Sequence, residues 1–223
     1  MSQQTSHACR LYVVSPPDLD LVIFQATMIS ALDAGDVAAF QLQTNNMDET
    51  TIMRCCKALM PIAHERDVAF ILSGHVEIAR RMGCDGIHLK KYNRTILDEA
   101  RAKLGSNAMI GVSCYSSKHD AMVAAENGAD YISFAPFFQR RTPFVDPDID
   151  ARLTENLAPI SLIEDWAEIS QTPVVASGGL KLDNVRQIVD AGADFACVSA
   201  AVWEHPQGAD KAVRAFNDIL TQK

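Results

Sequence analysis

One repeated unit constrains the fold of this chain more than any other feature. Four times, a helical segment ends at a glycine or another small residue, an acidic residue follows, and a short apolar strand begins. The glycines suit the left-handed conformation that often ends a helix. The four stretches are AGDVAAFQL (34–42), MGCDGIHL (82–89), NGADYISF (127–134) and AGADFACV (191–198), with the acidic residues Asp36, Asp85, Asp130 and Asp194.

Four further stretches have the same apolar character, which brings the number of predicted strands to eight. These stretches cover 10–14, 68–72, 108–112 and 173–177. Strands that are nearly all apolar, rather than alternating, are typical of a parallel sheet buried on both faces. Helical patterns fill the intervals at 21–34, 48–65, 76–82, 94–104, 117–127, 161–169, 182–191 and 209–221.

Eight strand–helix units predict an α/β fold, a single-domain (β/α)8 TIM barrel, over residues 10–223, with 1–9 as an N-terminal tail. A doubly wound open sheet is the alternative. It would usually need fewer strands, and SPPDLD (15–20) stands where its G-x-G-x-x-G loop would follow the first strand. We interpret 135–160, which is rich in proline and charge, as an elaborated loop on the catalytic face.

Composition narrows the partners and the compartment. The 223 residues are 48% hydrophobic and 22% charged, with a net charge of −8, which argues against nucleic acid or an anionic membrane surface as a partner. No apolar run reaches the roughly 18 residues of a membrane span, and MSQQTSHACR (1–10) lacks the apolar segment of a secretory signal. The six cysteines fit neither zinc nor disulfide spacing, so we expect a cytoplasmic protein. Relatives of this fold often form homo-oligomers, but patterning specifies no interface.

In a TIM barrel the chemistry lies at the carboxyl ends of the strands. Four cations follow strands there in this acidic chain, Lys90, Lys91, Arg140 and Arg141, and they predict a small anionic ligand. Backbone amides in the last two strand–helix loops could hold a phosphate. The residues predicted to do so are Gly178, Gly179, Ser199 and Ala200. The alternative is that Gly178 and Gly179 only form a tight turn.

These segments resemble the thiamine phosphate synthase family. PVVASGGLKLDNVRQIVDAGADFACVSAAVW (173–203) is similar to the C-terminal third of that family, and FQLQTNN, GIHLKKYN, IGVSCYSS and GADYISFAPFF stand where it has its other signature segments. The resemblance covers 10–220. It implies a reaction that joins an aminopyrimidine diphosphate to a thiazole phosphate, releases pyrophosphate and uses magnesium.

The chain departs from the family pattern around the diphosphate. Gln43 and Asn45 stand where the family has an arginine and a lysine. Gly74 and Asn93 stand where it has the two aspartates that bind magnesium, so we assign no metal-binding residues. The family pattern after the sixth strand, T-x-T-K, is replaced by 140–143, Arg-Arg-Thr-Pro. The residues that survive are Ser113, Thr142, Gly178, Gly179 and Ser199.

We therefore predict two anion sites. The phosphate site is the one named above, and the second comprises Lys90, Lys91, Arg140, Arg141 and Thr142. Ser113 and Lys91 are the predicted catalytic residues. The lysines and arginines either compensate for the lost ligands or reflect drift.

Three functional hypotheses follow from the resemblance and its departures. The first is a thiamine phosphate synthase with a rearranged diphosphate site. The second is a metal-independent enzyme such as a thiazole tautomerase, although Ala135-Pro136 is nearer the synthase pattern. The third is a catalytically inactive relative that binds a phosphorylated metabolite. Among other residues, we interpret His88 as structural, and Tyr12 and Tyr131 as core packing.

Overall fold

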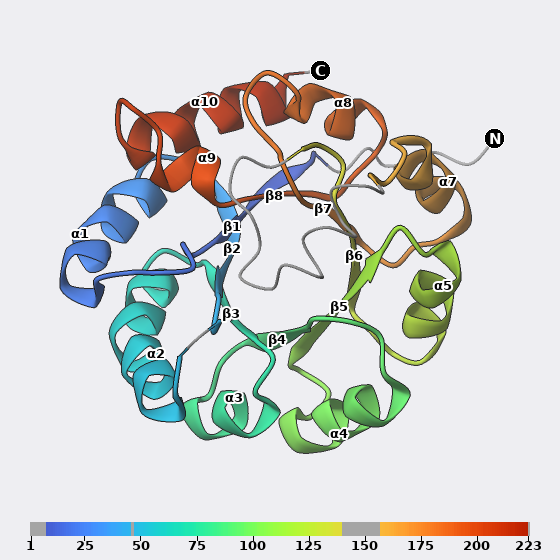
Figure 1. Cartoon of the computed structure of the whole chain (residues 1–223), viewed down its shortest axis with the longest axis horizontal. Helices are drawn as coiled ribbons and strands as arrows, with labels where there is room; N and C mark the ends of the chain where they lie inside the picture. The colour runs from blue at the N-terminus through green and yellow to red at the C-terminus, as the bar shows by residue number, and fades with distance from the viewer. Residues whose placement is uncertain (1–7, 46, 140–156, 223) are drawn as a thin grey trace.

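Eight parallel strands close into one barrel in sequence order in the computed structural model, which describes residues 8–45, 47–139 and 157–222. Figure 1 looks along the barrel, with the strands in an inner ring and the helices around them. The last strand pairs with the first, Ala196 beside Leu11. The predicted TIM barrel is confirmed, and the open sheet is excluded. The strands are β1 (Arg10–Val14), β2 (Val37–Leu42), β3 (Ala69–Ser73), β4 (Gly86–Leu89), β5 (Met109–Tyr115), β6 (Tyr131–Phe134), β7 (Val174–Ala176) and β8 (Phe195–Val198).

Each predicted helix is present, with ends within a few residues of the prediction. The described residues include one further short helix, α9, directly after β8, which the sequence pattern did not indicate. Within the described residues, no helix combines the length and the apolar character needed to span a membrane. The helices are α1 (Leu21–Leu32), α2 (Glu49–His64), α3 (Val76–Met82), α4 (Arg94–Leu104), α5 (Lys118–Glu126), α7 (Ser161–Ile169), α8 (Val185–Asp190), α9 (Ala200–Trp203) and α10 (Ala209–Thr221).

The strands are apolar on both faces because one face packs against the helices and the other packs inside the barrel. Outward-facing side chains such as Phe40 and Phe70 join the helices in one large core. Inward-facing side chains form a second, smaller cluster inside the barrel that includes Ile71 and Val175. The inward face also carries buried polar groups, among them Gln41. Some of these polar groups, including Gln41, line the cavity described below.

The repeated aspartates stabilise the amino-terminal end of the barrel. The carboxylate of Asp85 accepts a hydrogen bond from the Phe70 amide, that of Asp130 from Ile110, and that of Asp194 from Val174, each at 2.7 Å. Each aspartate precedes an even-numbered strand and bonds an amide near the start of the strand before it. These amides would otherwise lack a partner at the edge of the ladder. The fourth aspartate, Asp36, instead binds the guanidinium of Arg10.

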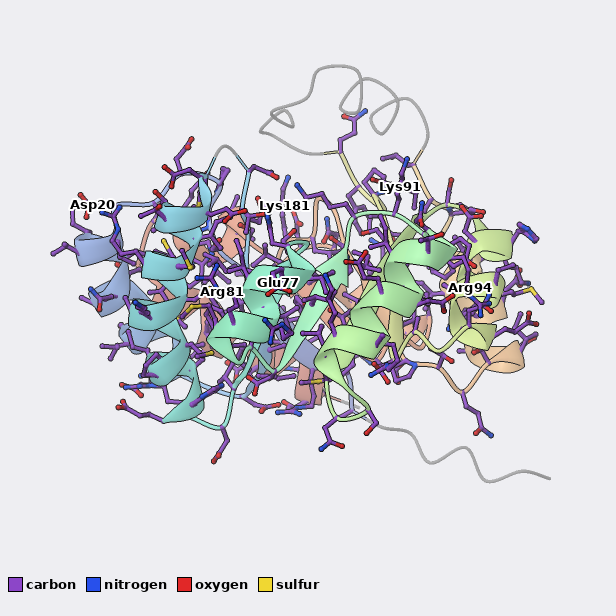
Figure 2. The ribbon with its side chains drawn as sticks, turned by 90° about the horizontal axis from the view of Figure 1, so that it is seen from below. Asp20, Glu77, Arg81, Lys91, Arg94 and Lys181 are labelled. Atoms are coloured by element: carbon purple, nitrogen blue, oxygen red, sulfur yellow. The ribbon has the colours of Figure 1, made fainter. Side chains whose placement is uncertain are left out.

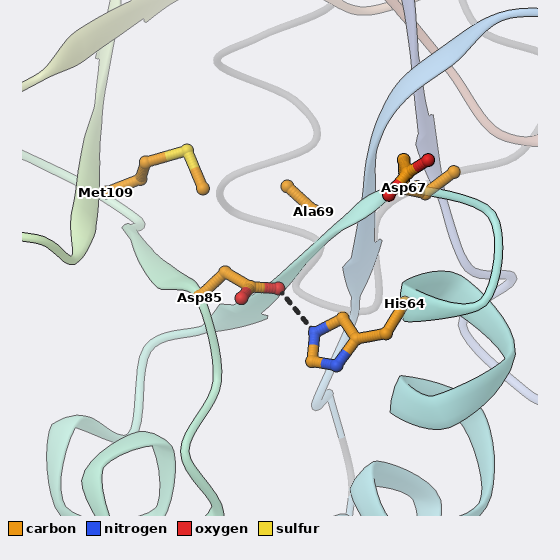
Figure 3. Close-up of a pocket in the computed structure, with 6 residues that line it drawn as sticks. His64, Asp67, Ala69, Asp85 and Met109 are labelled. Carbon is orange, nitrogen blue, oxygen red and sulfur yellow. Dashed lines mark hydrogen bonds and ion pairs between the residues drawn. The ribbon is translucent and has the colours of Figure 1, made fainter.

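Figure 3 shows the Asp85 carboxylate in a shallow pocket of about 380 Å³ lined also by Asp67 and Met109. The His64 imidazole Nε2 lies 2.8 Å from the same Asp85 oxygen that receives the Phe70 amide. This oxygen therefore joins the end of α2 to the start of β3.

Candidate active site

A cavity of about 1120 Å³ occupies the carboxyl end of the barrel. This volume suits a small-molecule ligand, and the position is the one at which TIM barrels place their chemistry. Side chains from inside the barrel form its floor, and the loops after the strands form its walls. Six of the residues predicted from the sequence line it together: Lys90, Ser113, Gly178, Gly179, Ser199 and Ala200.

The remaining predicted residues form two groups. Lys91 is exposed at the same end of the barrel as Lys181 (Figure 2), but it does not line the cavity. Arg140, Arg141 and Thr142 lie outside the described residues. Their contribution, like that of Lys91, stays a prediction.

The floor of the cavity is a chain of hydrogen bonds across five strands. The Tyr12 hydroxyl donates to Gln41 Oε1 at 2.9 Å and lies 3.0 Å from the Tyr131 hydroxyl. The Tyr131 oxygen is 3.2 Å from His88 Nδ1, and His88 Nε2 is 2.8 Å from Ser113 Oγ. Tyr12 and Tyr131 are buried, as predicted, but their hydroxyls belong to a polar network that the packing interpretation did not include.

Burial fixes the charge of this network. It lowers the pKa of His88 to about 4, so the imidazole is neutral near pH 7. It also raises the pKa values of Tyr12 and Tyr131, which keeps both phenols protonated. The floor is therefore uncharged, and any charge that meets a ligand is at the walls.

The predicted phosphate loops form one wall. Gly178 and Gly179 have φ values of +86° and +74°, which glycine adopts most readily. A Cβ on Gly178 would lie 2.6 Å from Pro136 Cβ, and one on Gly179 would lie 2.3 Å from the Phe138 carbonyl oxygen. Both glycines are thus required by close packing against the loop after β6, which agrees with the tight-turn interpretation.

The loops after β7 and β8 also offer backbone donors. Within the described part of the chain, the amides of Gly178, Gly179 and Ala200 donate to no protein acceptor. The Ser199 hydroxyl donates to the Ser15 carbonyl at 3.2 Å, so backbone amides, rather than this hydroxyl, are the donors that these loops offer to a phosphate.

Charged groups of both signs stand at the walls. The Lys90 ammonium donates to Asn45 Oδ1 at 2.9 Å. Lys181, Asp183 and Glu204 also line the cavity. Sequence reasoning missed these three because it considered the residues directly after each strand, whereas Lys181 and Asp183 lie farther along, just before α8, and Glu204 is the C-cap of α9.

The two positions that match the family's magnesium ligands do not fit a divalent cation. Gly74 has no side chain, and the Asn93 side chain accepts a hydrogen bond from the Ile96 amide at 3.1 Å as the N-cap of α4. A hard divalent ion favours carboxylate oxygens. Among the described residues, no group of three or more histidine, cysteine, aspartate or glutamate side chains could hold a metal ion.

The fold and the cavity together define a (β/α)8-barrel protein with a ligand site at the carboxyl ends of its strands. A family model described as thiamine monophosphate synthase matches residues 11–202. A thiamine-phosphate synthase of Rhodospirillum centenum is 40% identical over 212 residues, 95% of this chain and 98% of that protein. One of Hyphomonas neptunium is 38% identical over 216 residues, 95% and 93% of the two chains.

A solved structure supports the same fold. Thiamine phosphate pyrophosphorylase from Pyrococcus furiosus superposes with a TM-score of 0.78 at 24% identity, covering 96% of both chains. The chain belongs to the thiamine monophosphate synthase family. Membership supports a role in thiamine biosynthesis.

Proposed function

We propose that this protein forms thiamine phosphate by joining an aminopyrimidine diphosphate to a thiazole phosphate. One observation carries the proposal. A single cavity is lined by the loops whose backbone amides could bind a phosphate, at Gly178 and Ala200, and also by Lys90 and by Ser113 in the polar floor. Two phosphorylated substrates need two anion-binding regions within reach of one another. The relatives named thiamine-phosphate synthase, which this chain matches over nearly their whole length, support the same reaction.

The reaction assigns a distinct task to each wall. The carbon–oxygen bond to the diphosphate breaks, pyrophosphate leaves with the electron pair, and the thiazole nitrogen lone pair forms the new carbon–nitrogen bond. The loops after β7 and β8 orient the thiazole through its phosphate. Lys90, with the predicted contributions of Arg140 and Arg141, stabilises the negative charge of the departing pyrophosphate.

A second candidate function is binding of a phosphorylated metabolite without turnover. The glycine and asparagine at positions 74 and 93 favour it, because they remove the carboxylates that would hold a metal next to the diphosphate. A metal-independent reaction such as a tautomerisation would fit the same loss.

Product formation separates these functions. Purified protein is mixed with both substrates, with magnesium or with a chelator, and thiamine phosphate is measured. Product under either condition supports the synthase proposal, and its magnesium dependence reports whether other groups bind the metal. If neither condition gives product while calorimetry detects thiazole phosphate binding, the synthase proposal is wrong and the binding function replaces it.

A further inference from the structure

We infer that the hydrogen-bond chain in the cavity floor has a fixed direction, which holds His88 in its Nδ1–H form and makes the Ser113 hydroxyl an acceptor toward the cavity. His88 and the two tyrosines are then positioning residues that act through Ser113. All the contacts that support this inference are between side chains of the protein itself. Its meaning for substrate recognition rests on the proposed function.

The direction follows from counting protons along the chain. Tyr12 donates its only hydroxyl proton to Gln41 Oε1. The 3.0 Å contact between the two tyrosine hydroxyls therefore needs its proton from Tyr131. With that proton committed, the 3.2 Å contact between Tyr131 and His88 Nδ1 needs a proton on Nδ1.

The other ring nitrogen then has a defined role. A neutral imidazole carries one proton, and burial keeps His88 neutral near pH 7. Since that proton is on Nδ1, Nε2 has a free lone pair and accepts from Ser113 Oγ at 2.8 Å. The Ser113 proton points at His88, and only oxygen lone pairs are left for the cavity.

This arrangement changes the expected partner of Ser113. A fully ionised phosphate has only acceptor oxygens, so it gains nothing from a hydroxyl whose proton is already committed. A ligand group with an N–H or O–H would complete the hydrogen bonding. The floor at Ser113 therefore selects a donor on the uncharged part of a substrate, and the anions are left to the loops and the wall cations.

The tautomer of His88 tests the inference directly. Histidine side chains are labelled with ¹⁵N in the ligand-free protein, and long-range ¹⁵N–¹H spectra at pH 7 report which nitrogen of each ring is protonated. The His88→Gln variant assigns the signal. We expect the Nδ1–H form. An Nε2–H or doubly protonated ring in the unmodified protein would overturn the inference without bearing on catalysis.

Two variants test which groups donate and which accept along these hydrogen bonds. Tyr12→Phe removes the acceptor of Tyr131, frees that proton to donate to Nδ1, and should shift His88 toward the Nε2–H form. Ser113→Ala removes the group at the other end and should leave the Nδ1–H form unchanged. Tyr92→Phe is the matched control, because its hydroxyl contacts Asn127 and lies outside the chain. A shift in Ser113→Ala but not in Tyr12→Phe would reverse the direction and refute the inference.

Discussion

Gly178 offers a direct test of how the phosphate loop is built. Alanine at this position has two separate costs. The φ of +86° places an L-residue in the left-handed region, which costs about 1–2 kcal/mol. The added Cβ would also lie 2.6 Å from Pro136 Cβ, and overpacking of this kind costs about 1–3 kcal/mol. We expect Gly178→Ala to lower the free energy of unfolding by about 2–5 kcal/mol.

Gly83 is the matched control. Its φ is +70° at the end of α3, yet nothing lies within 4 Å of an added Cβ. Gly83→Ala should therefore lose only the backbone contribution, about 1–2 kcal/mol. Urea denaturation followed by circular dichroism measures both variants. Equal losses in the two variants would refute the claim that packing against the loop after β6 requires glycine at position 178.

Three other perturbations give measurable results. Asp194→Ala should lower the free energy of unfolding by about 1.5–3 kcal/mol, because it leaves the Val174 amide without its charged acceptor. Asp190→Ala, which breaks only an exposed ion pair, should lose at most about 0.5 kcal/mol in the same urea titration. Lys90→Ala should weaken pyrophosphate binding about fivefold by calorimetry, with the effect fading at high salt, and Lys91→Ala should weaken it less. The reverse order would make Lys91 the more important anion-binding residue. Acid should destabilise the protein through His88, since burial lowers its pKa from 6.5 to about 4 and the unfolded chain then binds the proton first. Stability present at neutral pH is lost between about pH 6.5 and 4, by about 2 kcal/mol from pH 7 to 5, and His88→Gln should lack this loss in urea titrations at the two pH values.

The barrel could be predicted because its signals are local and repeated. Each apolar run, such as AGADFACV, is short, ends at a turn and follows a glycine suited to a helix end, so the strand boundaries are legible without tertiary information. The repeated aspartates were recognisable as a pattern, but their role was not. The bond from Asp194 to the Val174 amide joins residues 20 apart, and no spacing rule predicts which amide is left unpaired at the barrel edge.

The hydrogen-bond network in the cavity floor could not be predicted from the sequence in this way. Tyr12 and Tyr131 lie 119 residues apart and meet only because β1 and β6 both direct a side chain into the barrel. On the sequence, each is an aromatic residue in an apolar strand, for which packing is the usual explanation. The same limit applies to Lys90 and Lys91, because a one-residue difference after a strand decides which side chain enters the cavity, and the sequence gives no reason to prefer either.

The contact between Lys90 and Asn45 bears on whether the altered site reflects compensation or drift. By the resemblance described above, Asn45 stands where the family has a lysine. The 2.9 Å bond between Lys90 Nζ and Asn45 Oδ1 places a cation beside that position on the cavity wall. A positive charge on this wall is what the compensation hypothesis predicts, and the effect of Lys90→Ala on pyrophosphate binding distinguishes it from drift. At positions 74 and 93, no carboxylate cluster among the described residues replaces the two aspartates of the family pattern. The magnesium dependence of product formation therefore tests most directly whether this site still uses a metal.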